Sequence, residues 1–388
     1  MKKRLLIALT LVLALQDCSW IRSWGEDKLE PGDPVPLVEF TSSLVTRQAW
    51  STRIGDGIGR QRTQLRPEIN DGGIYAADYK GLLVKLNAET GAKLWESKTD
   101  LPFSGGPGAH GDAVYLGTQD GEIHAFDAGS GATLWVAQVS SEVLAAPSAG
   151  DGVVVVRSID GRVFGLDQNS GRRLWIYDHA VPLLTLRGNS RPMIRAGVVF
   201  IGYDGGEVVA LSLADGTLIW EQAVVSTEGR SELERLADID GQLVYVASDL
   251  LVSSYKNRLA SLAADSGRLL WFKDIGSATG VSIDRVNLAI TDREDHVWLL
   301  DRRNGSTLWK QDSLSNRAVT RPAFLGNFVV VGDYDGYLHW IDASSGQFVA
   351  RDHVGGNGFV SAPLVAGNML YVLTRDGRLS AYAAGGER

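Results

Sequence analysis

The chain repeats a short motif in which a turn containing glycine is followed, four residues later, by tryptophan. The first copy reads Asn87-Ala-Glu-Thr-Gly91-Ala-Lys-Leu-Trp95, and a seventh copy keeps the turn but has Ala350 in place of the indole. Counted from Trp50, the successive intervals are 45, 40, 40, 45, 51, 38 and 41 residues. A period of this size made of short strands is typical of a β-propeller. We predict that the repeated indoles dock between neighbouring blades: Trp95, Trp135, Trp175, Trp220, Trp271 and Trp309.

The segments between successive tryptophans alternate turns with apolar runs. One example is Val153-Val-Val-Val156, which is followed by the Asp160-Gly161 pair and then by Val163-Phe-Gly-Leu166. Asp-Gly pairs favour tight hairpins because both residues tolerate the backbone conformations that such turns require. Each repeat therefore predicts one blade of four antiparallel strands.

The two ends of the repeat region predict how the ring closes. Seven turn motifs define seven blades, and residues 361–382 repeat the early strands of an eighth blade without its last strand. The strand that ends at Trp50 has no early strands before it, so it can complete that blade and remove an open sheet edge. We predict an all-β, eight-bladed β-propeller over residues 41–388, with seven blades as the alternative.

The first residues indicate export. Three basic residues precede an apolar run of 11 residues, Leu5 to Leu15, which is shorter than the roughly 20 residues of a membrane span and fits a secretory signal over residues 1–17. The single cysteine, Cys18, follows this run and resembles the lipid-bearing residue of bacterial lipoproteins. Leu15 fits that pattern, whereas Gln16 and Asp17 depart from its small uncharged residues. We expect a lipidated tether over residues 18–40; the alternative is an exported protein with an unmodified thiol.

Charge and composition exclude several classes of function. The net charge of −8, without a dense basic stripe, argues against nucleic-acid binding. The six histidines show no paired ligand spacing, so we predict no metal site, and Asp333-x-Asp335-Gly336 occupies a hairpin position instead of forming a calcium loop. We find no catalytic constellation and predict no cofactor.

Two long intervals between repeated tryptophans, Trp175–Trp220 and Trp220–Trp271, point to a binding surface; the other long interval, Trp50–Trp95, lies by the ring closure. Extra residues in a repeat fold go into surface loops, and here they fall at residues 179–192 and 226–241. The first loop carries Leu184, Leu186 and Arg187, a composition typical of an interface core, and the second carries acids that include Asp238 and Asp240. The alternative is that Leu186 packs inward and the acids are merely solvated.

The repeat resembles the tryptophan-docking propellers related to quinoprotein dehydrogenases and, more specifically, the BamB family of lipoproteins in the bacterial outer-membrane β-barrel assembly (BAM) machinery. The segments that carry this resemblance are Leu184-Thr-Leu-Arg187-Gly188, Glu234-Arg-Leu-Ala-Asp238-Ile-Asp240 and Gly332-Asp-Tyr-Asp-Gly-Tyr-Leu-His-Trp340-Ile. It implies a non-enzymatic scaffold at the periplasmic face of the outer membrane, held there only by its lipid.

The same resemblance implies partners. Leu184, Leu186 and Arg187 would form one patch of a surface that binds the periplasmic domains of BamA, and Asp238 and Asp240 an adjoining acidic patch. Other BAM subunits and unfolded outer-membrane proteins are further expected partners. Two other functions remain open for the fold: a quinone-dependent dehydrogenase and a periplasmic ligand-binding propeller.

Overall fold

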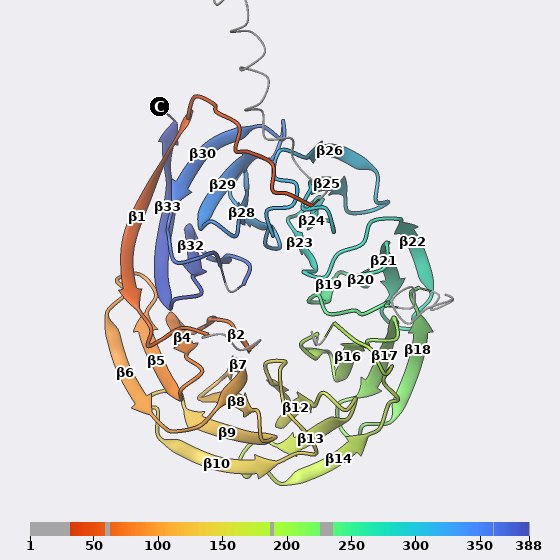
Figure 1. The fold of residues 1–388 in the computed structure, drawn as a ribbon. Coiled ribbons are helices and arrows are strands. Elements are labelled where there is room, and N and C mark those ends of the chain that lie inside the picture. Colours follow the sequence, from red (N-terminus) through yellow and green to blue (C-terminus); the bar gives the residue numbers. More distant parts are fainter. Residues whose placement is uncertain (1–31, 59–62, 187–189, 226–235, 360, 388) are drawn as a thin grey trace, which may run out of the picture.

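The computed structural model describes residues 32–58, 63–186, 190–225, 236–359 and 361–387. These residues form eight sheets arranged around a central axis, like the blades of a propeller (Figure 1). The predicted all-β, eight-bladed architecture is confirmed.

Each blade runs from a short strand at the axis to a strand at the rim (Figure 1). The innermost strands are β3 (Glu68–Asn70), β7 (Phe103–His110), β11 (Ser148–Gly150), β15 (Met193–Arg195), β19 (Val244–Val246), β23 (Val281–Ile283), β27 (Ala323–Leu325) and β31 (Leu364–Ala366). The second strands are β4 (Gly73–Ala77), β8 (Ala113–Thr118), β12 (Val153–Arg157), β16 (Val198–Gly202), β20 (Asp249–Ser254), β24 (Asn287–Thr291), β28 (Phe328–Gly332) and β32 (Met369–Leu373).

The third and outer strands complete the blades. The third strands are β5 (Leu82–Asn87), β9 (Glu122–Asp127), β13 (Val163–Asp167), β17 (Glu207–Ser212), β21 (Arg258–Ala263), β25 (Val297–Asp301), β29 (Tyr337–Asp342) and β33 (Arg378–Glu387). The outer strands are β6 (Lys93–Lys98), β10 (Thr133–Gln138), β14 (Arg173–Tyr177), β18 (Leu218–Ala223), β22 (Leu269–Lys273), β26 (Thr307–Gln311), β30 (Phe348–His353) and β1 (Leu44–Arg53).

The ring closes by pairing the first strand of the chain with the last. Strand β1 runs antiparallel to β33, with Leu44 opposite Glu387 and Arg53 opposite Arg378, and it is the fourth strand of the sheet that contains β31 and β32. The N-terminal strand thus completes the last blade, as the sequence predicts. One sheet departs from the four-stranded pattern, because β2 (Gln64–Leu65) adds to β7 in parallel and makes a fifth strand.

Strand position explains the hydrophobic patterns. Second and third strands are covered by neighbouring blades on both faces, so β12 is buried along its whole length and reads as a continuous apolar run. Outer strands alternate: in β10 only Trp135 is fully buried, while Leu134 and Val136 are about half exposed.

The repeated tryptophans lie between blades. Trp175, which is buried, donates from Nε1 to the carbonyl oxygen of Leu213 in the next blade at 2.9 Å. The turn glycine of that blade, Gly216, has φ +72°, and a Cβ added to it would lie 2.6 Å from Cε3 of the Trp175 indole. The turn glycine and the tryptophan of the motif therefore serve different junctions, each tryptophan contacting the glycine of the following repeat. Indole–carbonyl hydrogen bonds of this kind are made by Trp50, Trp95, Trp135, Trp175, Trp220 and Trp309.

The junction that lacks the repeated indole is filled by another tryptophan. Ala350 on β30 lies opposite Trp340 on β29, and the Trp340 side chain is fully buried in a cluster that joins this blade to the last one. Its Nε1 donates to Oδ2 of Asp352 at 2.8 Å. An indole from the adjacent strand therefore occupies the space next to Ala350.

Residues 33–40, ahead of β1, lie against the ring. Arg317 donates from NH1 to the carbonyl oxygen of Val35, Arg351 donates from NH1 to that of Val38, and the ring of Phe40 stacks on Phe348 with centroids 5.6 Å apart. The signal segment and Cys18 fall outside the described residues. In the part of the chain that the structure covers, no helix is long and apolar enough to cross a membrane.

Candidate functional site

The two inserted loops meet. The loop between β14 and β15 covers residues 178–192, and the loop between β18 and β19 covers residues 224–243. The backbone N–H of Leu186 in the first loop donates to Oδ2 of Asp238 in the second loop, at 2.6 Å. Asp238 is fully buried, so this charge-assisted hydrogen bond ties the two loops together away from water.

The apolar residues of the first loop face solvent. Leu183 is completely exposed, Leu184 is 44% exposed, and Leu186 is half-buried. Exposed leucines cost free energy in water, and a cluster of them beside polar groups is typical of a protein-binding surface. Arg187, the charged member of the predicted patch, lies outside the described residues, as do residues 226–235 of the second loop.

Asp238 and Asp240 do not form an exposed acidic surface. Both side chains are buried, and with Asp204, from the turn between β16 and β17, they place carboxylate oxygens within 4.8 Å of one another. Neither the surface patch implied by the family resemblance nor the solvated acids of the alternative describes this arrangement. The two aspartates shape the loops from inside the fold.

A buried arginine supports the acidic cluster from the neighbouring blade. Arg157 donates from NH2 to Oδ1 of Asp204 at 2.9 Å and from NH1 to the carbonyl oxygen of Gly202 at 2.6 Å. Its guanidinium also lies over the ring of Tyr203, 4.7 Å from the centroid. One guanidinium thus faces three carboxylates, which leaves the cluster with an excess of acidic groups.

Burial in this cluster, together with the neighbouring carboxylate charges, raises the pKa values of Asp238 and Asp240. Burial raises the pKa of Asp238 to about 6; the Leu186 N–H opposes that rise and the charge of Asp204 adds to it. Burial, and then the charges of Asp238 and Asp204, raise the pKa of Asp240 to about 8. Among the described residues, no hydrogen-bond partner lies near the buried Oδ1 of either aspartate. Protonation of Asp240 near neutral pH therefore relieves the repulsion.

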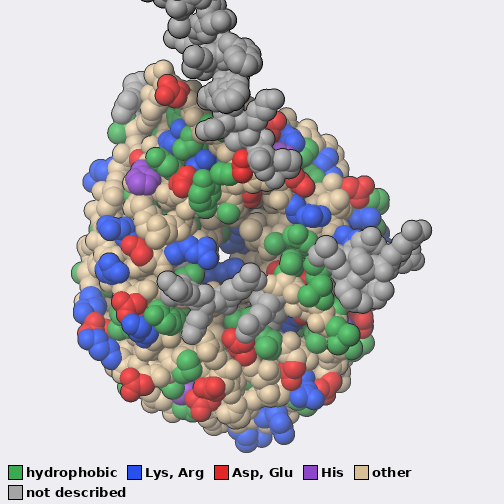
Figure 2. Space-filling view, in the orientation of Figure 1, with side chains coloured by type: hydrophobic (Ala, Val, Ile, Leu, Met, Phe, Trp, Pro, Cys, Tyr) green, Lys and Arg blue, Asp and Glu red, His purple; other side chains and the backbone are tan. Residues whose placement is uncertain are grey.

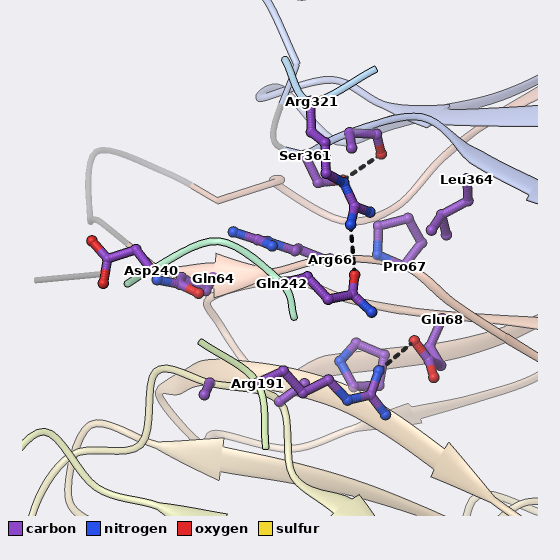
Figure 3. Close-up of a pocket in the computed structure, with 14 residues that line it drawn as sticks. Gln64, Arg66, Pro67, Glu68, Arg191, Asp240, Gln242, Arg321, Ser361 and Leu364 are labelled. Atoms are coloured by element: carbon purple, nitrogen blue, oxygen red, sulfur yellow. Dashed lines mark hydrogen bonds and ion pairs between the residues drawn. The ribbon is translucent and has the colours of Figure 1, made fainter. Parts of the chain in front are cut away.

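A cavity of about 200 Å³ lies at the axis, beside Asp240. Figure 3 shows side chains from several blades pointing into it, among them Arg66, Arg191 and Arg321. Arg191 pairs with Glu68 at 2.9 Å, and Arg321 donates from NH1 to Oε1 of Gln242 at 2.8 Å. Sequence reasoning missed this group, because its members are far apart in the chain and belong to no common motif.

Among the described residues, one further group has metal-ligand chemistry. Asp292, Glu294 and His296 share the turn between β24 and β25. Oδ2 of Asp292 contacts Nδ1 of His296 at 2.9 Å and accepts from Nε1 of Trp298 at 2.7 Å. These hydrogen bonds account for the placement of the turn.

Comparison with known proteins decides the family. A family model described as "Outer membrane protein assembly factor BamB" matches residues 79–311 and 300–388. The chain is 47% identical to the protein of that name from Pseudomonas aeruginosa, covering 96% of this chain and 97% of the relative. It is 36% identical to the Escherichia coli protein, covering 97% and 98%. The chain belongs to the BamB family.

Solved structures agree with this assignment. The crystal structure of BamB from Moraxella catarrhalis superimposes with a TM-score of 0.80 at 28% identity, covering 87% of this chain and all of the other. A quinohemoprotein alcohol dehydrogenase from Comamonas testosteroni superimposes with a TM-score of 0.66 at 14% identity, covering 88% and 77%. The second similarity shows the fold alone. As a BamB-family member the chain is a non-catalytic outer membrane protein assembly factor, which places it in the BAM complex and at the outer membrane.

Proposed function

We propose that the chain is a scaffold subunit that binds a periplasmic domain of BamA through the loop surface around Leu183, Leu184 and Leu186. The observation that carries this proposal is the hydrogen bond from the Leu186 backbone to buried Asp238, next to leucines that face solvent. The bond holds the loop backbone in place before a partner arrives. An ordered loop loses less conformational entropy on binding, so more of the burial energy of its leucines contributes to affinity.

In this proposal the two patches have different roles. Leu183 and Leu184 make direct contact, and Arg187 remains a predicted contact of the same loop. Asp238 is a positioning residue: it acts through the backbone of Leu186 and is buried itself. Asp240 belongs to the same buried cluster, on the inner side of the two loops.

Binding to the purified periplasmic domains of BamA tests the proposal. Burying a leucine side chain contributes about 1.5–3 kcal/mol, so we expect Leu184→Ala to raise the Kd roughly tenfold or more in calorimetric titrations. The matched control is Leu308→Ala on β26, where the leucine is 54% exposed on an outer strand. Arg187→Glu should weaken binding as well. Equal affinity for the wild-type, Leu184→Ala and Arg187→Glu chains would rule out this surface.

We also propose that Cys18 carries the lipid that holds the chain at the periplasmic face of the outer membrane. The residues between Cys18 and Asp33 number about 15 and span at most roughly 50 Å when extended. Because residues from 33 onward lie on the ring, the lipid would keep the propeller within that distance of the bilayer. Mass measurement of the mature chain tests this: a free thiol at Cys18 would refute the anchor.

A second role, contact with unfolded outer-membrane proteins, is favoured by the outer strands. Each lies at the end of its sheet, so one of its backbone edges faces away from the blade. Apolar side chains on these strands are exposed, including Leu94 at 54% and Phe272 at 50%. We propose that extended segments of client proteins pair with these edges. Site-specific crosslinking from position 94 or 272 to an unfolded outer-membrane protein tests this role, and the absence of crosslinked product from both positions would refute it.

A further inference from the structure

Three arginines from distant parts of the chain converge on the cavity at the ring axis. Arg66 lies between β2 and β3, and Arg191 and Arg321 each lie two residues before a strand, β15 and β27 respectively. Each of them leads into an innermost strand, and the innermost strands of all blades surround the central opening (Figure 1). Figure 2 shows basic side chains gathered at the central opening. Closure of the ring therefore creates a basic site that no single blade contains.

We propose that this cavity binds a small oxyanion, a carboxylate or a phosphate group of a free solute, between Arg66 and Arg321. Arg66 and Arg321 lie outside the two inserted loops, so this site is separate from the exposed leucines of the BamA-binding surface.

The three arginines differ in how their charges are balanced. Arg191 is neutralised by Glu68, which accepts from its NH1 at 2.9 Å. Arg321 donates to the neutral amide oxygen of Gln242, which satisfies one N–H and compensates no charge. Within the described chain, the guanidinium of Arg66 makes no hydrogen bond or ion pair, although its backbone N–H bonds to Gly106. Neither Arg66 nor Arg321 thus forms an ion pair with a carboxylate among the described residues, although Asp240 also lines the cavity.

The pKa values of the Arg321 and Arg66 side chains are both lowered. Burial and the neighbouring charge of Arg66 lower the pKa of Arg321 to about 10. Burial also lowers the pKa of Arg66. The negative charge of Asp240 opposes this lowering, and the positive charge of Arg191 adds to it. Solvent in the channel still reaches the Arg66 side chain, so an ion has access to it. A bound anion would offset the repulsion between the two guanidinium groups.

The donors at the cavity suit an oxyanion. A guanidinium carries five N–H donors in a planar fork that matches carboxylate and phosphate oxygens, and Arg321 uses one of them on Gln242. Gln242, whose Oε1 accepts that bond, also lines the cavity. The volume of about 200 Å³ is below the roughly 300–1,000 Å³ of pockets for drug-sized ligands, which favours a small ion.

Titration of the purified full chain with sodium phosphate and with sodium succinate, at matched ionic strength in sodium chloride, tests the site. We expect saturable binding with one ion per chain for at least one of the two, together with a rise in Tm. Arg66→Gln and Arg321→Gln should each weaken binding at least tenfold. Arg268→Gln, which changes an exposed arginine in the turn before β22, is the matched control and should bind like the wild type.

The possible results of this titration either support the anion site or overturn it. Phosphate alone, or succinate alone, would support the site and identify which oxyanion it prefers. In anion-free buffer the two variants should melt at or above the wild-type Tm, because each removes one of two repelling charges, and this result shows that they fold. Absence of saturable binding, or undiminished binding to the Arg66→Gln/Arg321→Gln double variant, would overturn the proposal.

Discussion

Replacing Asp240 by asparagine should change how the stability of the protein depends on pH. Asp240 is 8% exposed, and its pKa is raised from an ordinary 3.8 to about 8 by burial and by the charges of Asp238 and Asp204. Asparagine has nearly the same shape and keeps the side chain neutral at every pH. The substitution therefore removes the titration and preserves the packing.

The sign of the effect follows from the two pKa values. In the unfolded chain the carboxyl group loses its proton near pH 4, whereas in the folded chain it keeps the proton until about pH 8. Stability from this group is thus fully present below pH 4, falls as the pH rises, and levels off above pH 8. Each pH unit inside this window costs about 1.4 kcal/mol. Between pH 5 and pH 7 the wild type should lose about 3 kcal/mol that Asp240→Asn retains.

Urea denaturation followed by tryptophan fluorescence, at pH 5 and at pH 7, measures this difference. The control is Asp265→Asn, which changes an exposed aspartate in the turn between β21 and β22 and should follow the wild type at both pH values. The reasoning fails if Asp240→Asn and the wild type lose the same free energy of unfolding between pH 5 and pH 7.

Three further substitutions test the blade junctions by denaturation. Trp175→Ala should cost about 3–5 kcal/mol, since the indole is buried and bonded to the next blade, and a cost below 1 kcal/mol would contradict the docking role. Trp271→Ala should cost less, because that indole is only partly buried and its Nε1 has no hydrogen-bond partner in the described part of the chain; an equal cost would show that the hydrogen bond and the extra burial contribute little. Trp340→Ala should cost about 3–5 kcal/mol because it empties the junction beside Ala350, and wild-type stability in this variant would show that the last two blades are joined by other contacts.

The propeller architecture could be predicted from the sequence because each blade repeats the same short motifs at a regular interval. Glycine turns and tryptophans at intervals near forty residues define blades, and the unmatched strand at Trp50 together with the incomplete blade at residues 361–382 predicts the closure that β1 and β33 make. Loop length identified the two insertions for a similar reason, since a repeat shows where residues have been added. The extra strand β2 gave no such signal, because it is two residues long and pairs in parallel with a blade that is already complete.

The details of the candidate site depended on contacts between residues distant in the chain. The sequence named Asp238 and Asp240, but only the fold sets them beside Asp204 and Arg157 and buries them. Asp238, expected at the surface, instead accepts a hydrogen bond from the Leu186 backbone inside the fold. No local sequence pattern predicts the arginine cluster at the axis, because Arg66 and Arg321 become neighbours only when the ring closes. Periodicity along one strand or turn can be read from residue order, whereas the charge and burial of a side chain depend on what the other blades bring to it.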